Sequence, residues 1–187
     1  MMNTTHVAIA ASLVAPLAVV LPEFATIAGL AAILGAAAPD LDIVLGEHRR
    51  TLHYPILGWI PTVPAVLLMV AVPGEVTVGV ACFLLGFATH STMDVVGGGP
   101  ERRPWTTRSR RGVYAHVPVP GRWLVPRRWV RYDGAPEDFL FGLAAAIPAL
   151  VVFTGPVRSL LVAGITISLF YTLFRKQIPD VTDRLFG

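Results

Sequence analysis

Six apolar segments, separated by polar connections, constrain this chain more than any other feature of its sequence. An apolar helix of about 20 residues crosses the hydrocarbon core of a bilayer, and several of these segments hold only about 16. The sequence predicts an all-α fold, namely a polytopic membrane helix bundle with about six apolar helices and one long basic cytoplasmic loop. The predicted helices cover residues 6–21, 24–38, 55–72, 76–96, 138–153 and 157–174. Four full spans with re-entrant short segments remain the alternative.

The composition favours a membrane protein over a soluble one. Hydrophobic residues make up 54% of the chain and charged residues 14%, whereas a typical soluble domain has about 25% charged residues. We expect one integral-membrane domain over residues 1–187. It consists of a motif-bearing four-helix half (1–96), a basic loop rich in Trp and Arg (97–137), and a helical hairpin with a tail (138–187).

The first apolar segment and the single cysteine exclude two simpler interpretations. No Lys or Arg precedes Arg49, so the first segment lacks the positive n-region of a signal peptide and is expected to remain as a helix. Cys82 is the only cysteine, which excludes an intrachain disulfide and a metal site built from thiolates.

The positive charges predict the orientation of the bundle. Of the 15 Lys and Arg residues, all but Arg158 lie in the two long connections, 39–54 and 97–137, or in the tail. With six spans these segments share one side with the N-terminus, and the positive-inside rule makes that side cytoplasmic. We therefore expect a multi-pass protein of the inner (plasma) membrane, with both termini in the cytoplasm.

The basic loop interleaves arginine with tryptophan, as in "VPGRWLVPRRWVRYDG". Beside membrane helices this pattern indicates an interfacial segment whose tryptophans lie at headgroup level and whose arginines meet anionic lipid. Membrane lipid is the expected partner, and no specific nucleic acid is predicted.

The stretch "GFATHSTMD" places His90 and Asp94 four residues apart at the end of an apolar segment. On a helix that spacing puts both on one face, and ionisable residues within a membrane helix are candidates for function. A structural His–Asp hydrogen bond is the alternative. The other histidines and several aspartates also lie at the predicted cytoplasmic helix ends or in the connections on that side. They include His6, Asp40, Asp42, His48, His53 and His116.

Imidazole and carboxylate without thiolate are ligands that suit zinc, manganese or iron. The number of candidate ligands exceeds what one tetrahedral ion needs. We therefore expect one or two divalent ions, most simply zinc, with manganese as the alternative. One ion would leave the remaining residues to orient its ligands, and two ions would share a bridging carboxylate.

The ordered motifs "TTH", "GAAAPDLDIVLGEHRRTLHYP" and "GFATHSTMD" resemble the family of inner-membrane metal-dependent hydrolases that includes a LexA-regulated bacterial member. The order of His and Asp residues is also distantly similar to zinc-dependent phospholipase C and the related single-strand nucleases. One departure is Leu52-His53-Tyr54, where the family has Thr-His-Ser. The resemblance implies a metal-dependent hydrolase with an all-helical fold. The implied metal ligands are His6, Asp40, Asp42, His53, His90 and Asp94.

The predicted function is a membrane-embedded metal-dependent hydrolase of phosphoesters, with phospholipid headgroups among its candidate substrates and its site at the cytoplasmic face. The predicted catalytic residues are Asp40, Asp42 and His48, and either aspartate that is not a ligand is a candidate general base. Candidates for holding the phosphate are Arg102, Arg103 and His116. The alternatives are an ion-coupled transporter and a structural or regulatory membrane protein with a non-catalytic metal site.

Overall fold

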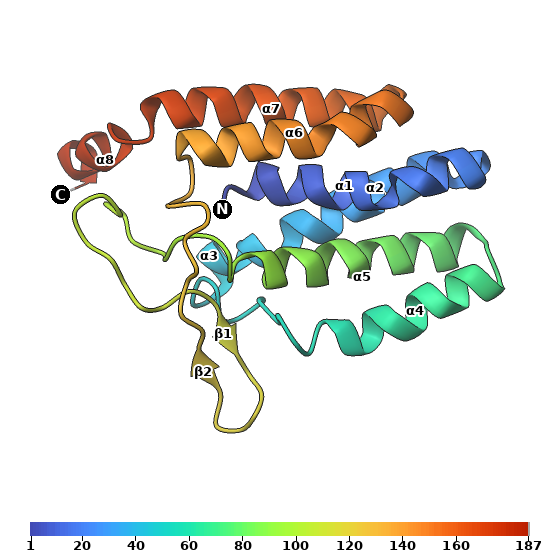
Figure 1. Cartoon of the computed structure of the whole chain (residues 1–187), viewed down its shortest axis with the longest axis horizontal. Coiled ribbons are helices and arrows are strands. Elements are labelled where there is room, and N and C mark those ends of the chain that lie inside the picture. The colour runs from blue at the N-terminus through green and yellow to red at the C-terminus, as the bar shows by residue number, and fades with distance from the viewer. Residues whose placement is uncertain (187) are drawn as a thin grey trace.

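The computed structural model describes residues 1–186 and shows a bundle of apolar helices that run roughly alongside one another (Figure 1). Two short 3₁₀ turns and a two-stranded hairpin interrupt or join the helices. The elements in chain order are α1 (Asn3–Val20), η1 (Pro22–Phe24), α2 (Ala25–Ala37), η2 (Ala38–Leu41), α3 (Asp42–Leu45), α4 (Trp59–Ala71), α5 (Glu75–Met93), β1 (Tyr114–Ala115), β2 (Arg122–Trp123), α6 (Pro136–Val152), α7 (Gly155–Phe174) and α8 (Ile178–Phe186).

The helix α2 lies at the centre of the bundle, in contact with α1 on one side and α5 on the other. Its sequence is rich in Ala and Gly, so the neighbouring backbones approach closely. Positions Gly35 and Gly86 have no room for a side chain, because an added Cβ would meet the carbonyl oxygens of Phe83 and Ala32 respectively. The outer helix α4 packs on α5, while α6 packs on α1 and α7 packs on α6 and α1.

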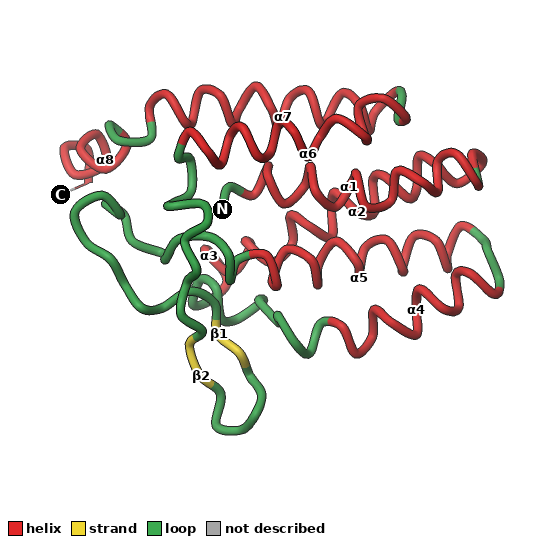
Figure 2. The backbone as a smooth tube through the Cα atoms, in the orientation of Figure 1, coloured by secondary structure: helices red, strands yellow, loops and turns green. Residues whose placement is uncertain are grey.

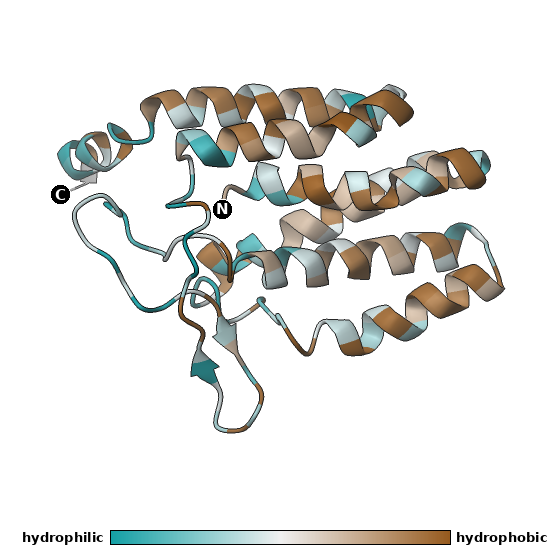
Figure 3. Ribbon diagram, viewed as in Figure 1, coloured by the Kyte–Doolittle hydropathy of each residue, from teal (hydrophilic) through white to brown (hydrophobic). Residues whose placement is uncertain are grey.

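Six apolar helices are present, which confirms the all-α prediction at the level of the helices. Four stretches are long and apolar enough to cross a membrane: Asn3–Val20, Pro22–Leu45, Glu75–Met93 and Gly155–Phe174. The helices α4 and α6 have 13 and 17 residues, and the 13 residues of α4 reach only about 20 Å. Many large apolar side chains of the helices are exposed, and much of the helical ribbon in Figure 3 has the brown colour of hydrophobic residues.

Both termini and the long connections gather at one end of the bundle, where Figure 2 shows most of the loop segments. The tight turns after α1, α4 and α6 lie at the opposite end. This arrangement matches the alternation expected from the sequence. The end that carries the long connections is also the more hydrophilic one in Figure 3.

Pro39 ends the central helix and turns the chain toward this hydrophilic end. A proline lacks the N–H that would continue the α-helical ladder, and Pro39 is the second residue of the 3₁₀ turn η2, which directly follows α2. The turn carries Asp40, and the single-turn helix α3 begins at Asp42. The motif "PDLD" therefore directs two carboxylates toward neighbouring elements at the point where an apolar helix stops.

The basic loop folds back on the site end of the bundle. The strands β1 and β2 form a short antiparallel pair, with Tyr114 opposite Trp123. The main-chain N–H of Arg127 donates to the carbonyl of Val95 at 2.8 Å, and that of Tyr114 donates to the carbonyl of Arg49 at 2.9 Å. The pairing was not predicted, because two-residue strands leave no periodic pattern in the sequence.

We predict that Gly86→Ala destabilises the protein by about 1–3 kcal/mol, because overpacking forces α2 and α5 apart. Thermal unfolding in detergent measures the effect. The matched control is Gly164→Ala on α7, where the added Cβ meets only the Thr4 methyl at 3.6 Å. Equal melting temperatures for the two variants would contradict the close packing of α2 on α5.

Candidate metal centre

Histidines and aspartates from five segments meet at the hydrophilic end of the bundle. They come from α1, η2, α3, the connection after α3, and the end of α5. Their nitrogen and oxygen atoms form two groups within which all ligand atoms lie within 4.8 Å of one another. These groups, which could each hold a metal ion, are Asp40, Asp42, His48 and His53, and His6, His90 and Asp94.

Two of the imidazoles are oriented by a hydrogen bond from their Nδ1 atoms. The Nδ1 atom of His53 lies 2.8 Å from a carboxylate oxygen of Asp42, and the Nδ1 atom of His90 lies 2.5 Å from the carbonyl oxygen of Ala36. A carbonyl and a carboxylate only accept hydrogen bonds, so both Nδ1 atoms carry the proton and donate it. The Nε2 atoms of His53 and His90 are both buried and have no hydrogen-bond partner among the described residues.

Two carboxylates are held in the same manner, with one oxygen bound and one facing the histidines. Asp40 accepts a hydrogen bond from Asn3 through Oδ2 at 2.8 Å, and Asp94 faces the Nε2 atom of His6 through Oδ1 at 3.1 Å. Their other oxygens lie close to the free imidazole nitrogens. Asp40 Oδ1 is 3.6 Å from His53 Nε2 and 3.4 Å from His90 Nε2.

Four inward-facing atoms, two from each of the two groups, lie close together where the groups meet, and the four separations measured among them are those expected of ligands around one ion. Asp94 Oδ2 lies 3.3 Å from His53 Nε2 and 3.9 Å from His90 Nε2, so the four measured edges among these atoms and Asp40 Oδ1 run from 3.3 to 3.9 Å. Zinc bound tetrahedrally at about 2.0–2.1 Å separates its ligands by about 3.3 Å. Two free nitrogens and two carboxylate oxygens thus form a donor set that fits a tetrahedral divalent ion.

Asp42 orients His53 and His48 by binding the Nδ1 atom of each ring. It is fully buried, and its Oδ2 atom accepts from His53 while its Oδ1 atom lies 2.9 Å from Nδ1 of His48. The main-chain N–H of Leu52 donates to it as well, at 3.3 Å. A carboxylate that receives the outer N–H of a metal-binding histidine is the usual second partner at such sites, because it fixes the ring and raises its basicity.

His6, which lies on α1, packs against the same group. Its ring stacks on His90 with the centroids 3.9 Å apart, and its Nε2 atom points to Asp94. Because Asp94 only accepts, Nε2 of His6 carries the proton in this arrangement. The position of His6 therefore supports Asp94, and a direct ligand role for His6 stays a prediction.

The group is rich in mutually close charges. The main-chain nitrogen of Met1 and the guanidinium Nε of Arg49 each lie 3.3 Å from Asp94. Burial opposes the charged form of His53, but the carboxylates of Asp42 and Asp94 outweigh it and raise the pKa of His53 to about 9. A proton and a metal ion compete for the same Nε2 electron pair, so this imidazole releases a proton when it binds metal.

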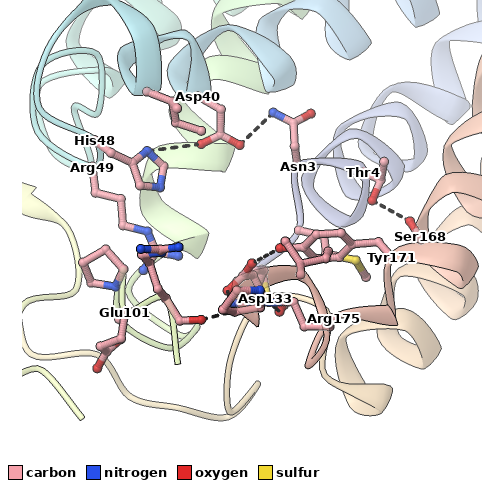
Figure 4. A pocket seen from close by; sticks show the side chains of 18 of the residues that line it. Asn3, Thr4, Asp40, His48, Arg49, Glu101, Asp133, Ser168, Tyr171 and Arg175 are labelled. Carbon is pink, nitrogen blue, oxygen red and sulfur yellow. Dashed lines mark hydrogen bonds and ion pairs between the residues drawn. The ribbon is translucent and has the colours of Figure 1, made fainter. Parts of the chain in front are cut away.

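A cavity of about 470 Å³ opens beside the group. In Figure 4 the side chains of Asp40, His48 and Arg49 lie on one side of it, while Asp133, Tyr171 and Arg175 lie on the other. Apolar residues from α3, α7 and α8 complete the wall, namely Ile43, Ile167 and Ile178. His48 is more exposed than Asp40, with 31% of its side chain accessible against 19%.

Two of the three residues predicted to hold phosphate share a partner on α8, and the third lies apart from them. Arg102 lines the far wall of the cavity but pairs with Asp183 of α8 at 2.8 Å. Arg103 also binds Asp183, at 2.7 Å, and lies outside the residues that line the cavity. His116 packs 4.7 Å from the ring of Tyr54, next to the hairpin. The structure therefore brings Arg102 and Arg103 together on the carboxylate of Asp183, and it places His116 elsewhere, beside Tyr54.

Sequence reasoning missed three contributors to the group. Asn3 holds Asp40, and its spacing of three residues from His6 on one helix would have indicated a shared face. The carbonyl of Ala36 orients His90, which no side-chain pattern reveals. In the sequence Arg49 indicates only the orientation of the bundle, as one of the positive charges in the first long connection. In the structure its side chain is buried beside Asp94.

We predict that Asp42→Asn lowers zinc affinity by about 10–100-fold, because the orienting partner of His53 loses its charge. Competition with a chromogenic chelator measures the affinity in detergent. The control is Asp180→Asn, whose carboxylate pairs with Arg103 on the surface of the molecule. Unchanged zinc affinity in Asp42→Asn would contradict the orienting role.

We also predict that zinc binding at pH 7 releases about one proton from His53, since its pKa of about 9 leaves it protonated before the ion arrives. Zinc affinity should therefore rise with pH until about pH 9. Isothermal titration in buffers of different ionisation enthalpy counts the protons. Binding without proton release would show that His53 is not a ligand.

Comparisons of the chain with models of protein families, with curated proteins and with solved structures find no match. The resemblance seen in the sequence motifs stays a prediction. The function is therefore inferred from the geometry of the buried His and Asp residues.

Proposed function

We propose that the protein is a membrane-embedded, metal-dependent hydrolase that acts on phosphoesters. The observation that carries this proposal is the convergence of four ligand atoms, each oriented by a separate contact on its far side. Two of them are buried imidazole nitrogens without a hydrogen-bond partner among the described residues. Burying such groups without a partner is unfavourable, and a bound cation is the simplest group that satisfies both.

Zinc fits this donor set better than manganese. The edges of 3.3 to 3.9 Å exceed the roughly 3.0 Å that adjacent ligands would show around an octahedral ion with bonds of about 2.1 Å. Two imidazoles and two carboxylates also satisfy the four-coordinate preference of zinc. We assign one ion to Asp40, His53, His90 and Asp94, with Asp42 and His6 orienting these ligands.

The location of the group suits a reaction at the membrane surface. Its residues lie at the ends of candidate spans, where the long connections also gather. Fourteen of the 15 Lys and Arg residues lie in the connections and the tail at this end. By the positive-inside rule the site faces the cytoplasm, and both termini share that side.

His48 is placed to move a proton at the edge of the cavity. Its Nδ1 atom donates to Asp42, so its Nε2 atom is left with the electron pair that accepts a proton from an attacking water. Asp42 then stabilises the imidazolium, as a carboxylate does for a catalytic histidine. A divalent ion held by Asp40, His53, His90 and Asp94 would supply a Lewis acid able to polarise a phosphoryl oxygen and to lower the pKa of water.

We predict that His48→Gln lowers kcat by about 10²–10⁴-fold with a chromogenic phosphoester while zinc stays bound, since a proton acceptor contributes about that much. His90→Ala, in contrast, should lose both zinc and turnover, because it removes a ligand. Elemental analysis gives the zinc content, and release of nitrophenolate gives the rate.

The same measurements of zinc content and turnover distinguish a catalytic zinc site from a purely structural one. A structural zinc site would give a zinc-loaded wild type that melts at a lower temperature after chelation and turns over no phosphoester. Wild-type protein purified without chelators and found free of zinc and manganese would contradict the metal site itself. His48→Gln with wild-type kcat would overturn the proton-transfer role.

A further inference from the structure

Arg49 is the one arginine of the cavity wall that reaches the metal group. Its side chain is 4% accessible, and its Nε atom lies 3.3 Å from Oδ2 of Asp94. That Nε atom is within ion-pair distance but makes no hydrogen bond with the described residues. Nη1 donates to the carbonyl of Gly98. The guanidinium is thus buried, with a hydrogen bond from Nη1 and no hydrogen-bond acceptor for Nε among the described residues.

The backbone at this position is held in an unusual conformation. Arg49 has a φ of +63°, which lies in the left-handed region that residues other than Gly, Asn and Asp rarely occupy. The carbonyl of Arg49 accepts from the N–H of Tyr114 at 2.9 Å, which ties the residue to strand β1. Conformations of this kind persist where surrounding contacts fix them, and they cluster at functional sites.

The charges around Arg49 leave its guanidinium without a full counter-ion. Asp94 is already shared by His6, His53 and the candidate ion, so it cannot fully neutralise the guanidinium as well. With a divalent ion bound, two cationic groups would flank one edge of the cavity. An anion between them would satisfy both, and a phosphate offers oxygens for an ion and for a guanidinium at once.

The other arginines of the cavity wall are already satisfied. Arg175 donates to Asp133 through Nε and Nη2, at 3.0 and 3.2 Å, and to the carbonyl of Arg102 through Nη1 at 3.2 Å. Arg102 pairs with Asp183. Neither has a contact with the metal group. Of the arginines that line the cavity, Arg49 is therefore the one that faces the metal group, where the amino group of Met1 also lies 3.3 Å from Asp94.

We propose that Arg49 is a substrate-binding residue that, together with the ion, holds the anionic phosphoryl group in the cavity and so selects phosphoesters over uncharged esters. This inference rests on the proposed function, because the ion is its second anchor. It assigns the recognition of phosphate to a buried arginine of the first long connection instead of to Arg102, Arg103 and His116.

Titration of inorganic phosphate into zinc-loaded protein tests the inference. The protein is kept in maltoside detergent with unbound zinc removed, and isothermal titration gives the Kd. Arg49→Gln should weaken phosphate binding by at least about tenfold, since it loses a charge-assisted contact. Arg49→Lys should weaken it less, because the charge stays and the planar fork is lost.

The matched control is Arg50→Gln. Arg50 is adjacent in sequence but exposed, and it pairs with Glu47, so its variant should bind phosphate within about twofold of wild type. Zinc content is measured for every variant. Arg49→Lys keeps the test valid where Arg49→Gln fails to fold.

The outcomes separate the inference from the proposed function. Equal phosphate affinity in wild type, Arg49→Gln and Arg49→Lys, in protein that holds zinc and hydrolyses phosphoesters, overturns only the role of Arg49. Phosphate binding that depends on Arg49 without any turnover supports the inference and contradicts the hydrolase. A zinc-loaded wild type that binds no phosphate overturns the inference, and a protein that takes up no zinc overturns both.

Discussion

The carboxylate of Asp42 is the interaction on which the candidate site depends. It is fully buried, so its charge would be strongly unfavourable without partners. It therefore receives donors on both oxygens: His48 on one, His53 and the amide of Leu52 on the other. Because these donors must carry protons on Nδ1, the Nε2 atoms of both rings are fixed as the reactive positions. One buried anion thus decides which nitrogen of each ring donates a hydrogen bond and which one is left to act as an acceptor.

The frame that carries these side chains is set by close helix packing. Gly35 and Gly86 let α2 and α5 meet backbone to backbone, and in this arrangement the Ala36 carbonyl lies where it accepts from His90. Pro39 then ends α2 at the level of the site. Within residues 35–42 the chain has the small residues that let α2 pack on α5, the proline after α2 and the two carboxylates of the group. The same short segment therefore determines both the helix packing and the positions of these carboxylates.

The sequence predicted much of the fold and part of the site, for physical reasons that differ between residues. Hydrophobic runs and prolines predicted six apolar helices, although they did not reveal that α4 begins only at Trp59. The spacing of His90 and Asp94 predicted a shared helix face. The separate roles of Asp40 and Asp42 could not be predicted, because both lie in one short turn and only tertiary contacts distinguish an inward oxygen from an orienting one. Arg49 lies in an aperiodic connection, and its contacts with Asp94, Gly98 and the main chain of Tyr114 all come from residues far away in the sequence.

The contacts of Asp138 bear on how the protein is made. Its carboxylate accepts from the Met2 amide at 2.7 Å and from the Thr5 hydroxyl at 2.8 Å, and so joins the start of α6 to the start of α1. His6 is one residue beyond that join. The first 96 residues contain every candidate ligand, yet the helix that brings in His6 is fastened by a residue synthesised much later. During translation the ribosome therefore delivers all the candidate ligands well before it delivers the residue that fastens the start of α1.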